Sequence, residues 1–222
     1  LRVCRSCRAV STNASFDSAG RIRTGGGAQL NNSGIWQDQN AFDNRISNDF
    51  GGAASTFTNT GTYTKSGAGT TDIQLAFNNT SSGPGTGVVN VTAGTLILSG
   101  GGTSNGSFTG AGGAQLGFAS GHTLQAGSSI NAANVEFFGS GTNTVSGTYT
   151  VTGTTTVSGG TTTFDGTVAN SGGALLATGG RVNFSNPAGG VFSTINLAGG
   201  TIGGTQTVTA TGLTTWTAGT MT

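Results

Sequence analysis

Two cysteines, Cys4 and Cys7, have a spacing that could support redox or metal chemistry. A Cys-x-x-Cys sequence can be a redox pair or half of a zinc site. Zinc normally takes four ligands, and the single histidine, His122, is more than a hundred residues away. No βαβ pattern surrounds the cysteines, which argues against thioredoxin-like chemistry. We therefore interpret them as incidental thiols in an arginine-rich leader, and we expect no metal site and no cofactor.

Residues 73–222 contain only three charged residues, Glu136, Asp165 and Arg181, and these are the remaining candidates for catalysis. Glycoside hydrolysis needs two carboxyl groups about 5–10 Å apart. Asp165 and Arg181 are 16 positions apart, and no second acid accompanies them. His122 has no evident catalytic partner, and no Gly-x-Ser-x-Gly sequence occurs in a strand-to-helix setting. We expect no catalytic residues and no enzyme activity, with a carbohydrate-active or carbohydrate-binding β-helix as the alternative.

Charge is scarce and unevenly distributed in this sequence. Charged residues make up 7% of the chain, against about 25% in an ordinary globular domain. Twelve of the fifteen lie within residues 1–72. The net charge of +1 gives no electrostatic case for nucleic-acid binding. No apolar run reaches about 18 residues, so no transmembrane helix is expected. The start lacks Met and a signal-peptide stretch, which predicts a mature form or a fragment.

A short repeating unit accounts for this composition. From residue 142 onward, about five extended residues alternate with Gly, Gly-Gly or Asn, and glycines recur every six or seven positions, at 141, 147, 153, 159, 166, 172 and 179. Thr and Val alternate within the units, which is the period of a strand with one buried face. We expect glycine to supply positive φ at sharp corners, and almost no helix to form.

A longer period of about 20 residues predicts that these units wind into stacked coils. Four apolar pairs are 20 positions apart and one is 19 apart: Leu96–Leu116, Leu98–Phe118, Phe118–Phe138, Phe164–Phe184 and Val145–Phe164. Three short strands per coil would bring such residues into interior columns. A β-sandwich is the alternative, although its strands and turns usually recur every 8–12 residues. We predict a solenoid over residues 25–222, with an irregular loop at about 37–50, and an N-terminal arm or cap over residues 1–24.

The sequences FTNTGTYTKSGAGTT, VNVTAGTLILSGGGT and GTYTVTGTTTVSGGTTTFDGTV resemble repeats of large secreted bacterial surface proteins. These are the passenger domains of autotransporters and filamentous-haemagglutinin-like adhesins. The resemblance covers roughly residues 25–222 and lies in composition and rhythm. It implies a right-handed parallel β-helix, an extracellular or cell-surface location, and a role in adhesion, biofilm or extracellular fibres. Such families have no shared catalytic residues, and the arginine-rich first ten residues depart from their pattern.

The expected function is therefore a non-catalytic structural or adhesive element outside the cell, either a segment of a surface-protein solenoid or a subunit of a fibre. Its expected partners are other copies, associated end to end through exposed strand edges, or a surface polysaccharide or host ligand. Ice binding is a minor alternative, because Thr-x-Thr recurs at positions 148, 154, 161 and 207. The intervals between these pairs do not match the expected period of the coils.

Overall fold

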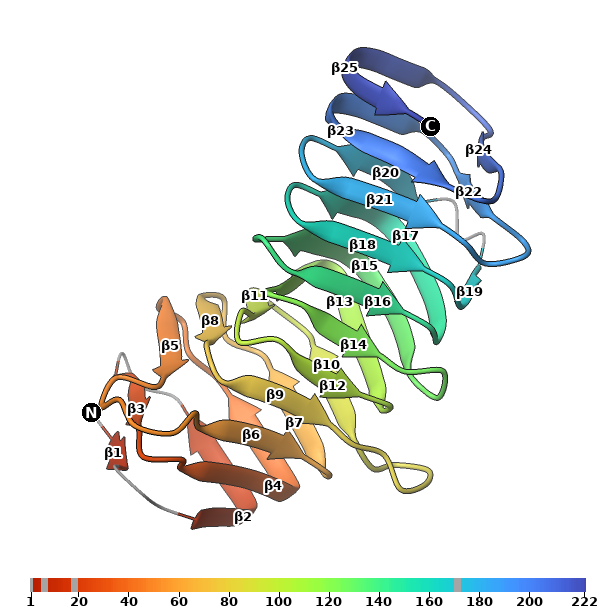
Figure 1. The fold of residues 1–222 in the computed structure, drawn as a ribbon. Helices are drawn as coiled ribbons and strands as arrows, with labels where there is room; N and C mark the ends of the chain where they lie inside the picture. Colours follow the sequence, from red (N-terminus) through yellow and green to blue (C-terminus); the bar gives the residue numbers. More distant parts are fainter. Residues whose placement is uncertain (1, 5–7, 17–19, 170–172) are drawn as a thin grey trace.

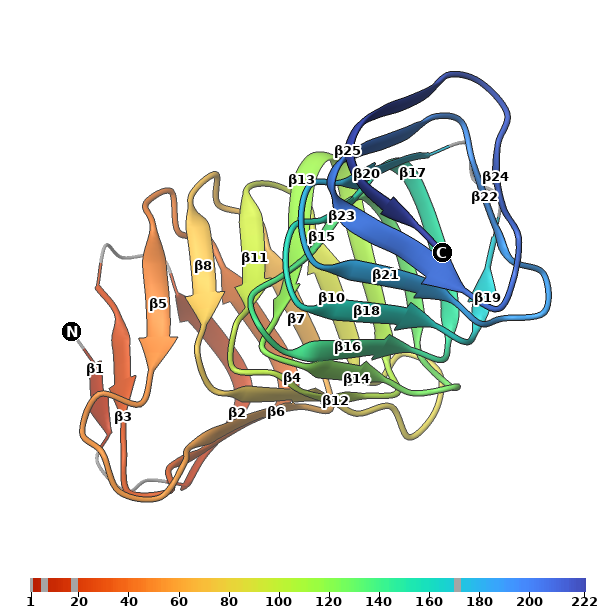
Figure 2. The same ribbon diagram turned by 45° about the horizontal axis from the view of Figure 1, so that its top comes forward.

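The computed structural model describes residues 2–4, 8–16, 20–169 and 173–222, and within these ranges every regular element is a β-strand. The strands pair in parallel and build a β-solenoid of about 10 turns. The two termini lie at opposite ends of the stack (Figure 1). This confirms the expected all-β fold with parallel coils about 20 residues apart. The coils have three faces, called A, B and C here, and Figure 2 shows the last coils obliquely as loops.

The strands of each face are connected by parallel pairing from one coil to the next. Face A contains β1 (Arg2–Cys4), β3 (Ile22–Thr24), β5 (Asn44–Ser47), β8 (Thr70–Ile73), β11 (Thr95–Leu98), β20 (Ala174–Ala177) and parts of the long strands β13 (Ser107–Ala119), β15 (Ser129–Phe138), β17 (Thr148–Val157), β23 (Ile195–Gly204) and β25 (Thr214–Met221). Face B contains β6 (Thr56–Asn59), β9 (Ala76–Asn79), β12 (Gly102–Ser104), β14 (His122–Leu124), β16 (Thr142–Val145), β18 (Thr161–Phe164), β21 (Arg181–Phe184), the first halves of β2 (Arg8–Phe16) and β4 (Gln29–Asp38), and the ends of β23 and β25.

Face C completes each coil. It contains the second halves of β2 and β4, then β7 (Thr62–Lys65), β10 (Val88–Val91), the first halves of β13, β15 and β17, and β19 (Thr167–Val168). On the corresponding side of the last coils, β22 (Gly190–Phe192) and β24 (Val208–Ala210) form a separate two-stranded sheet.

Alternation of buried and outward side chains along each strand explains why the coils stack. In strands such as β18 the threonines at the first and third positions face outward, and the apolar residue at the fourth is fully buried. Parallel register repeats this alternation of buried and outward side chains in every coil, so the buried residues form continuous interior columns. On face A one column contains Ile22, Ile46, Ile73, Leu98, Phe118, Phe137, Val157, Ala177 and Leu197.

Four of the five apolar pairs predicted from the sequence are register partners. These are Leu96–Leu116, Leu98–Phe118, Phe164–Phe184 and Val145–Phe164. The fifth prediction is wrong, because Phe118 pairs with Phe137 and not with Phe138. This coil is one position shorter than expected, so the strand alternation buries Phe137 and leaves Phe138 only partly buried.

The N-terminal coils are longer than the others. In the face A column, the register partners Ile22 and Ile46 are 24 positions apart, and Ile46 and Ile73 are 27 apart. Beyond Leu98, successive partners are only 19 or 20 positions apart. The extra residues form corner loops, and the loop of residues 80–87 projects from the stack (Figure 1).

Two segments that the sequence set apart contain regular strands. Within the expected irregular loop at 37–50, residues 37–38 end β4 and residues 44–47 form β5. Within the expected arm, β1 and β2 pair with β3 and β4 as further strands of the stack. The described parts of both segments therefore contribute strands to the solenoid.

The recurring glycines are required by close approach between coils. None of those at 141, 147, 153, 159, 166 and 179 has positive φ, contrary to the expectation, and residue 172 lies outside the described ranges. A Cβ atom on Gly147 would lie 2.1 Å from the carbonyl oxygen of Ser128, one coil earlier. On Gly166 it would lie 2.2 Å from the carbonyl oxygen of Gly147. Side chains are therefore excluded at this corner because consecutive backbones nearly touch.

Candidate functional site

A groove on the outer side of face A gathers charged side chains from the N-terminal coils. The hollow has a volume of about 550 Å³. It is lined by Gly20, Arg21, Asp43, Asn44, Arg45, Thr70, Asp72 and Ile97. In β5, β8 and β11 the residues beside Ile46, Ile73 and Leu98 face outward, so strand alternation directs Arg45, Asp72 and Ile97 to the groove. Parallel register makes Arg45, Asp72 and Ile97 direct neighbours in three successive coils.

The arginines on β3 and just before it are held by one carboxylate. Arg23 donates from Nε to Asp49 Oδ2 at 2.7 Å, and its guanidinium lies 4.6 Å from the centre of the Phe50 ring. Arg21 is more distant, with Nη1 3.9 Å from the same oxygen, and its side chain is 45% exposed. A hydrogen bond from Ser47, followed by the bond from Arg23, lowers the pKa of Asp49. Asp49 therefore stays ionised, and Arg21 keeps most of its donors for another partner.

The acids of the groove already accept hydrogen bonds from the protein. Asp43 Oδ1 accepts the backbone N–H of Thr70 at 2.8 Å, and this bond is the largest cause of the lowered pKa of Asp43. Asp72 accepts Nε2 of Gln74 at 2.7 Å and the hydroxyl of Ser99. Hydrogen bonds of this kind fix the carboxylates as acceptors with a set orientation.

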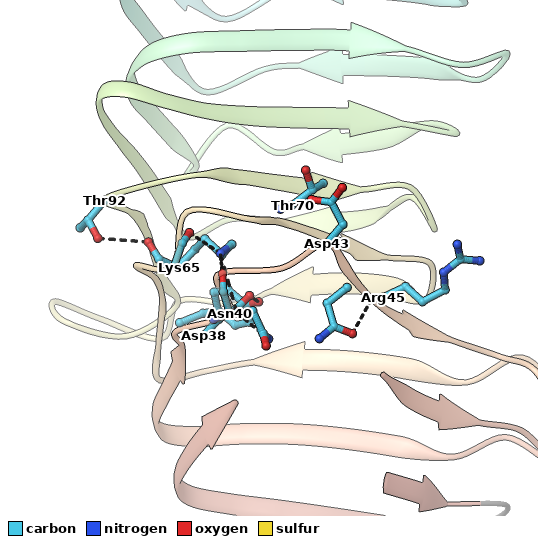
Figure 3. A network of polar contacts seen from close by, with 10 residues as sticks. Asp38, Asn40, Asp43, Arg45, Lys65, Thr70 and Thr92 are labelled. Atoms are coloured by element: carbon cyan, nitrogen blue, oxygen red, sulfur yellow. Dashed lines mark hydrogen bonds and ion pairs between the residues drawn. The ribbon is translucent and has the colours of Figure 1, made fainter. Parts of the chain in front are cut away.

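Arg45 is the groove's available cation. Its backbone N–H donates to Asn44 Oδ1 at 2.9 Å, but its exposed guanidinium has no hydrogen bond or ion pair within the described part of the chain. Figure 3 shows its side chain directed away from the buried residues Asp38 and Lys65. The groove thus presents an unpaired planar donor between oriented carboxylate acceptors. Such an arrangement suits a ligand rich in hydroxyl groups or a ligand that carries a carboxylate.

Sequence reasoning missed this site. It treated residues 37–50 as irregular and considered only the acids beyond residue 73. The concentration of charge within residues 1–72 was the available signal. The structure brings Arg45 beside Asp72 through one of the long N-terminal coils, and the expected period does not predict this interval.

The charged residues considered from the sequence are dispersed. Glu136, on the outer side of β15, accepts hydrogen bonds from Gln115 at 2.8 Å and from Ser158 at 2.7 Å. Arg181 donates to Asn183 at 2.7 Å and to Thr222 at 3.3 Å, while Asp165 lies at the corner between β18 and β19. None of them belongs to an ion pair among the described side chains.

His122 lies in the interior. It is fully buried, and its Nε2 shares a hydrogen bond of 2.9 Å with the hydroxyl of Ser104. Its ring contacts Phe108 and Phe118, with centroid distances of 6.4 and 5.2 Å. Burial lowers the pKa of His122 to about 4, so the imidazole is neutral near pH 7. A substrate in solvent has no access to this pair.

The Thr-x-Thr pairs are divided among the faces. Those at 148, 154 and 161 lie on faces C, A and B of one coil. A different set is aligned, because Thr123, Thr144 and Thr163 are register partners on face B. Threonines are therefore aligned one per strand along a column, whereas the Thr-x-Thr pairs at 148, 154 and 161 do not stack on one face.

No group of three or more His, Cys, Asp or Glu side chains close enough to bind a metal ion occurs in the described ranges. The interpretation of Cys4 and Cys7 concerns side chains outside the described part. Among the described residues, no helix has the length and apolar character needed to cross a membrane. Neither a family model, nor a curated protein sequence, nor a solved structure matches this chain.

Proposed function

We propose that this chain is a non-catalytic extracellular structural or adhesive element, a segment of a solenoid like those of autotransporter passengers and filamentous-haemagglutinin-like adhesins. The observation that carries the proposal is a continuous apolar column in the interior. The apolar column on face A runs from Ile22 to Leu197, and each member is at most 7% exposed. A rod with a filled interior has no internal binding cavity along this column, so a function would depend on its length and its outer faces.

The groove on face A is the proposed adhesive contact. Its exposed donor, Arg45, lies next to the acceptor Asp72, and Asn44 and Thr70 add polar groups. Polysaccharides present rows of hydroxyl groups that both donate and accept, so they match such a mixed surface. The lowered pKa of Asp43 keeps this carboxylate ionised at neutral pH, which suits an acceptor and not a proton donor.

The variant Arg45→Gln should weaken polysaccharide binding about tenfold or more, because a hydrogen bond from a charged donor is worth about 1.5–3 kcal/mol. Binding of the purified chain to a panel of immobilised neutral and acidic polysaccharides measures the effect. Arg181→Gln is the matched control, because this exposed arginine lies on face B far from the groove, and it should bind as the wild type does. Equal binding by the two variants would exclude the groove as the contact.

The same preparations distinguish binding from catalysis. We expect no release of reducing sugars from any bound polysaccharide. A release that disappears in Asp43→Asn or Asp72→Asn would overturn the non-catalytic role and favour the carbohydrate-active alternative.

The fibre form of the proposal rests on the parallel strand pairing that joins successive coils, because the same pairing can join the coils of two copies. Two apolar side chains, Leu213 just before β25 and Trp216 within it, are 71% and 58% exposed. Exposed strand edges favour pairing with another chain. We expect rods that lengthen with concentration in negative-stain electron microscopy, and fewer of them for Trp216→Lys. Rods of one short length at every concentration would exclude end-to-end association.

A further inference from the structure

Two opposite charges, on Asp38 and Lys65, lie inside the solenoid. Asp38 at the end of β4 and Lys65 at the end of β7 are register partners in consecutive coils of face C. The next partner in this column is the buried Val91. Both charged side chains are fully buried, and Lys65 Nζ lies 3.9 Å from Asp38 Oδ1. The pair is therefore closed off from solvent.

The groups around the pair hold it in one arrangement (Figure 3). Tyr63 donates its hydroxyl to Asp38 Oδ2 at 2.8 Å, and Asn40 donates its side-chain amide to Oδ1 at 3.1 Å. Lys65 Nζ donates to the carbonyl oxygens of Asn40 at 3.1 Å and Gly67 at 2.5 Å. A Cβ atom at Gly67 would lie 2.0 Å from the Asn40 carbonyl oxygen, so the backbone encloses the amine tightly.

Burial also affects the protonation of Lys65. Desolvation lowers the pKa of Lys65, although Asp38 and Asp43 oppose this effect. Removing a charge from water costs several kcal/mol per ion in proteins, so burial favours the neutral amine of Lys65. A neutral amine beside a carboxyl group provides the two reactants of amide formation.

We propose that Lys65 and Asp38 form an intramolecular amide bond that links two consecutive coils. The neutral Nζ attacks Asp38 Cγ, the Nζ–Cγ bond forms, and one Cγ–O bond breaks. The leaving oxygen takes the two protons that the Lys65 ammonium gives up, one before the attack and one after it, and departs as water. No oxidant, reductant or further reactant is needed.

Two features of the site favour this condensation. Well-oriented intramolecular reactions reach effective molarities of about 10⁵–10⁸ M, and the register holds these two groups as direct neighbours. The hydroxyl of Tyr63 stays protonated, because burial and the charge of Asp38 raise its pKa well above the ordinary value. It donates to Oδ2, where negative charge develops in the tetrahedral intermediate.

The intact mass of the full 222-residue chain, measured after unfolding in denaturant, tests the proposal directly. We expect a deficit of about 18 Da, one water, relative to the mass calculated from the sequence. Trypsin should fail to cut after Lys65, so that residues 24–45 stay joined to residues 46–181 in the digest. The calculated mass, together with a free peptide of residues 24–45, would overturn the proposal.

Two variants locate the bond, and mass reports on them whether or not they fold fully. Lys65→Arg keeps the cation but lacks a primary amine, and should have its calculated mass. Asp165→Asn changes a carboxylate at the corner between β18 and β19, away from this cluster, and should keep the deficit of one water. A wild-type deficit of about 17 Da, one ammonia, would overturn the assignment to Asp38 and place the bond on the Asn40 side chain.

Discussion

Replacing Phe164 by alanine should lower the free energy of unfolding by about 3–5 kcal/mol, the range for deletion of a buried phenylalanine side chain. Phe164 is fully buried, and its ring lies 4.8 Å from Tyr149, 5.2 Å from Phe184 and 5.8 Å from Phe137, measured between centroids. These rings belong to neighbouring coils on more than one face. The cavity would therefore weaken contacts within a coil and between coils together.

Urea unfolding followed by circular dichroism measures this loss. Phe42→Ala is the matched control, because Phe42 is 64% exposed and its removal should change stability by no more than about 0.5 kcal/mol. In a stacked array each unit contacts only its neighbours, so hydrogen exchange should accelerate first in β16, β18 and β21. Similar losses in the two variants would contradict the role of the interior aromatic column.

The interior of the C-terminal coils was predictable from the sequence, because their length is nearly constant. Where the coil length holds, apolar residues at the expected spacing become register partners, as Leu98–Phe118 and Phe164–Phe184 do. A single shortened coil was enough to displace the expected partner from Phe138 to Phe137. The period alone therefore predicts the members of an interior column only to within one residue. In a strand, a shift of one residue moves a side chain from the buried face to the outer face.

The N-terminal coils and the groove could not be predicted from the period of the sequence, for two physical reasons. Corner loops can lengthen a coil without disturbing the strands, so the interval from Arg45 to Asp72 follows no period. Buried polar side chains also break the hydrophobic pattern that marks a strand. Asp38 and Lys65 occupy interior positions because specific partners satisfy them, and pairing of this kind is not visible in the sequence.

His122 should make the protein less stable as the pH falls from about 6.5 to about 4. Burial lowers its folded-state pKa to about 4, whereas an unperturbed histidine titrates near 6.5. Between these values the unfolded chain binds a proton that the folded chain does not. Stability contributed by the neutral imidazole is complete above pH 6.5, and up to about 3 kcal/mol of it is lost by pH 4.

The variant His122→Gln separates this effect from other titrations. Glutamine retains a polar group near Ser104 but does not titrate, so its free energy of unfolding should change less than that of the wild type between pH 6.5 and 4. Asp43 and Asp49 have lowered pKa values, so their stabilisation is lost as the pH falls below about 4, outside this window.

Burial is the dominant cause of the lowered pKa of His122. The neighbours Ser104, Phe108, Phe118 and Asn143 are all uncharged. A charged imidazole would therefore find no counter-ion among these contacts, and the folded interior should exclude the proton until the pH approaches 4. Parallel pH profiles of the variant and the wild type would mean that a proton reaches His122 in the folded state, and that this part of the interior is open to water.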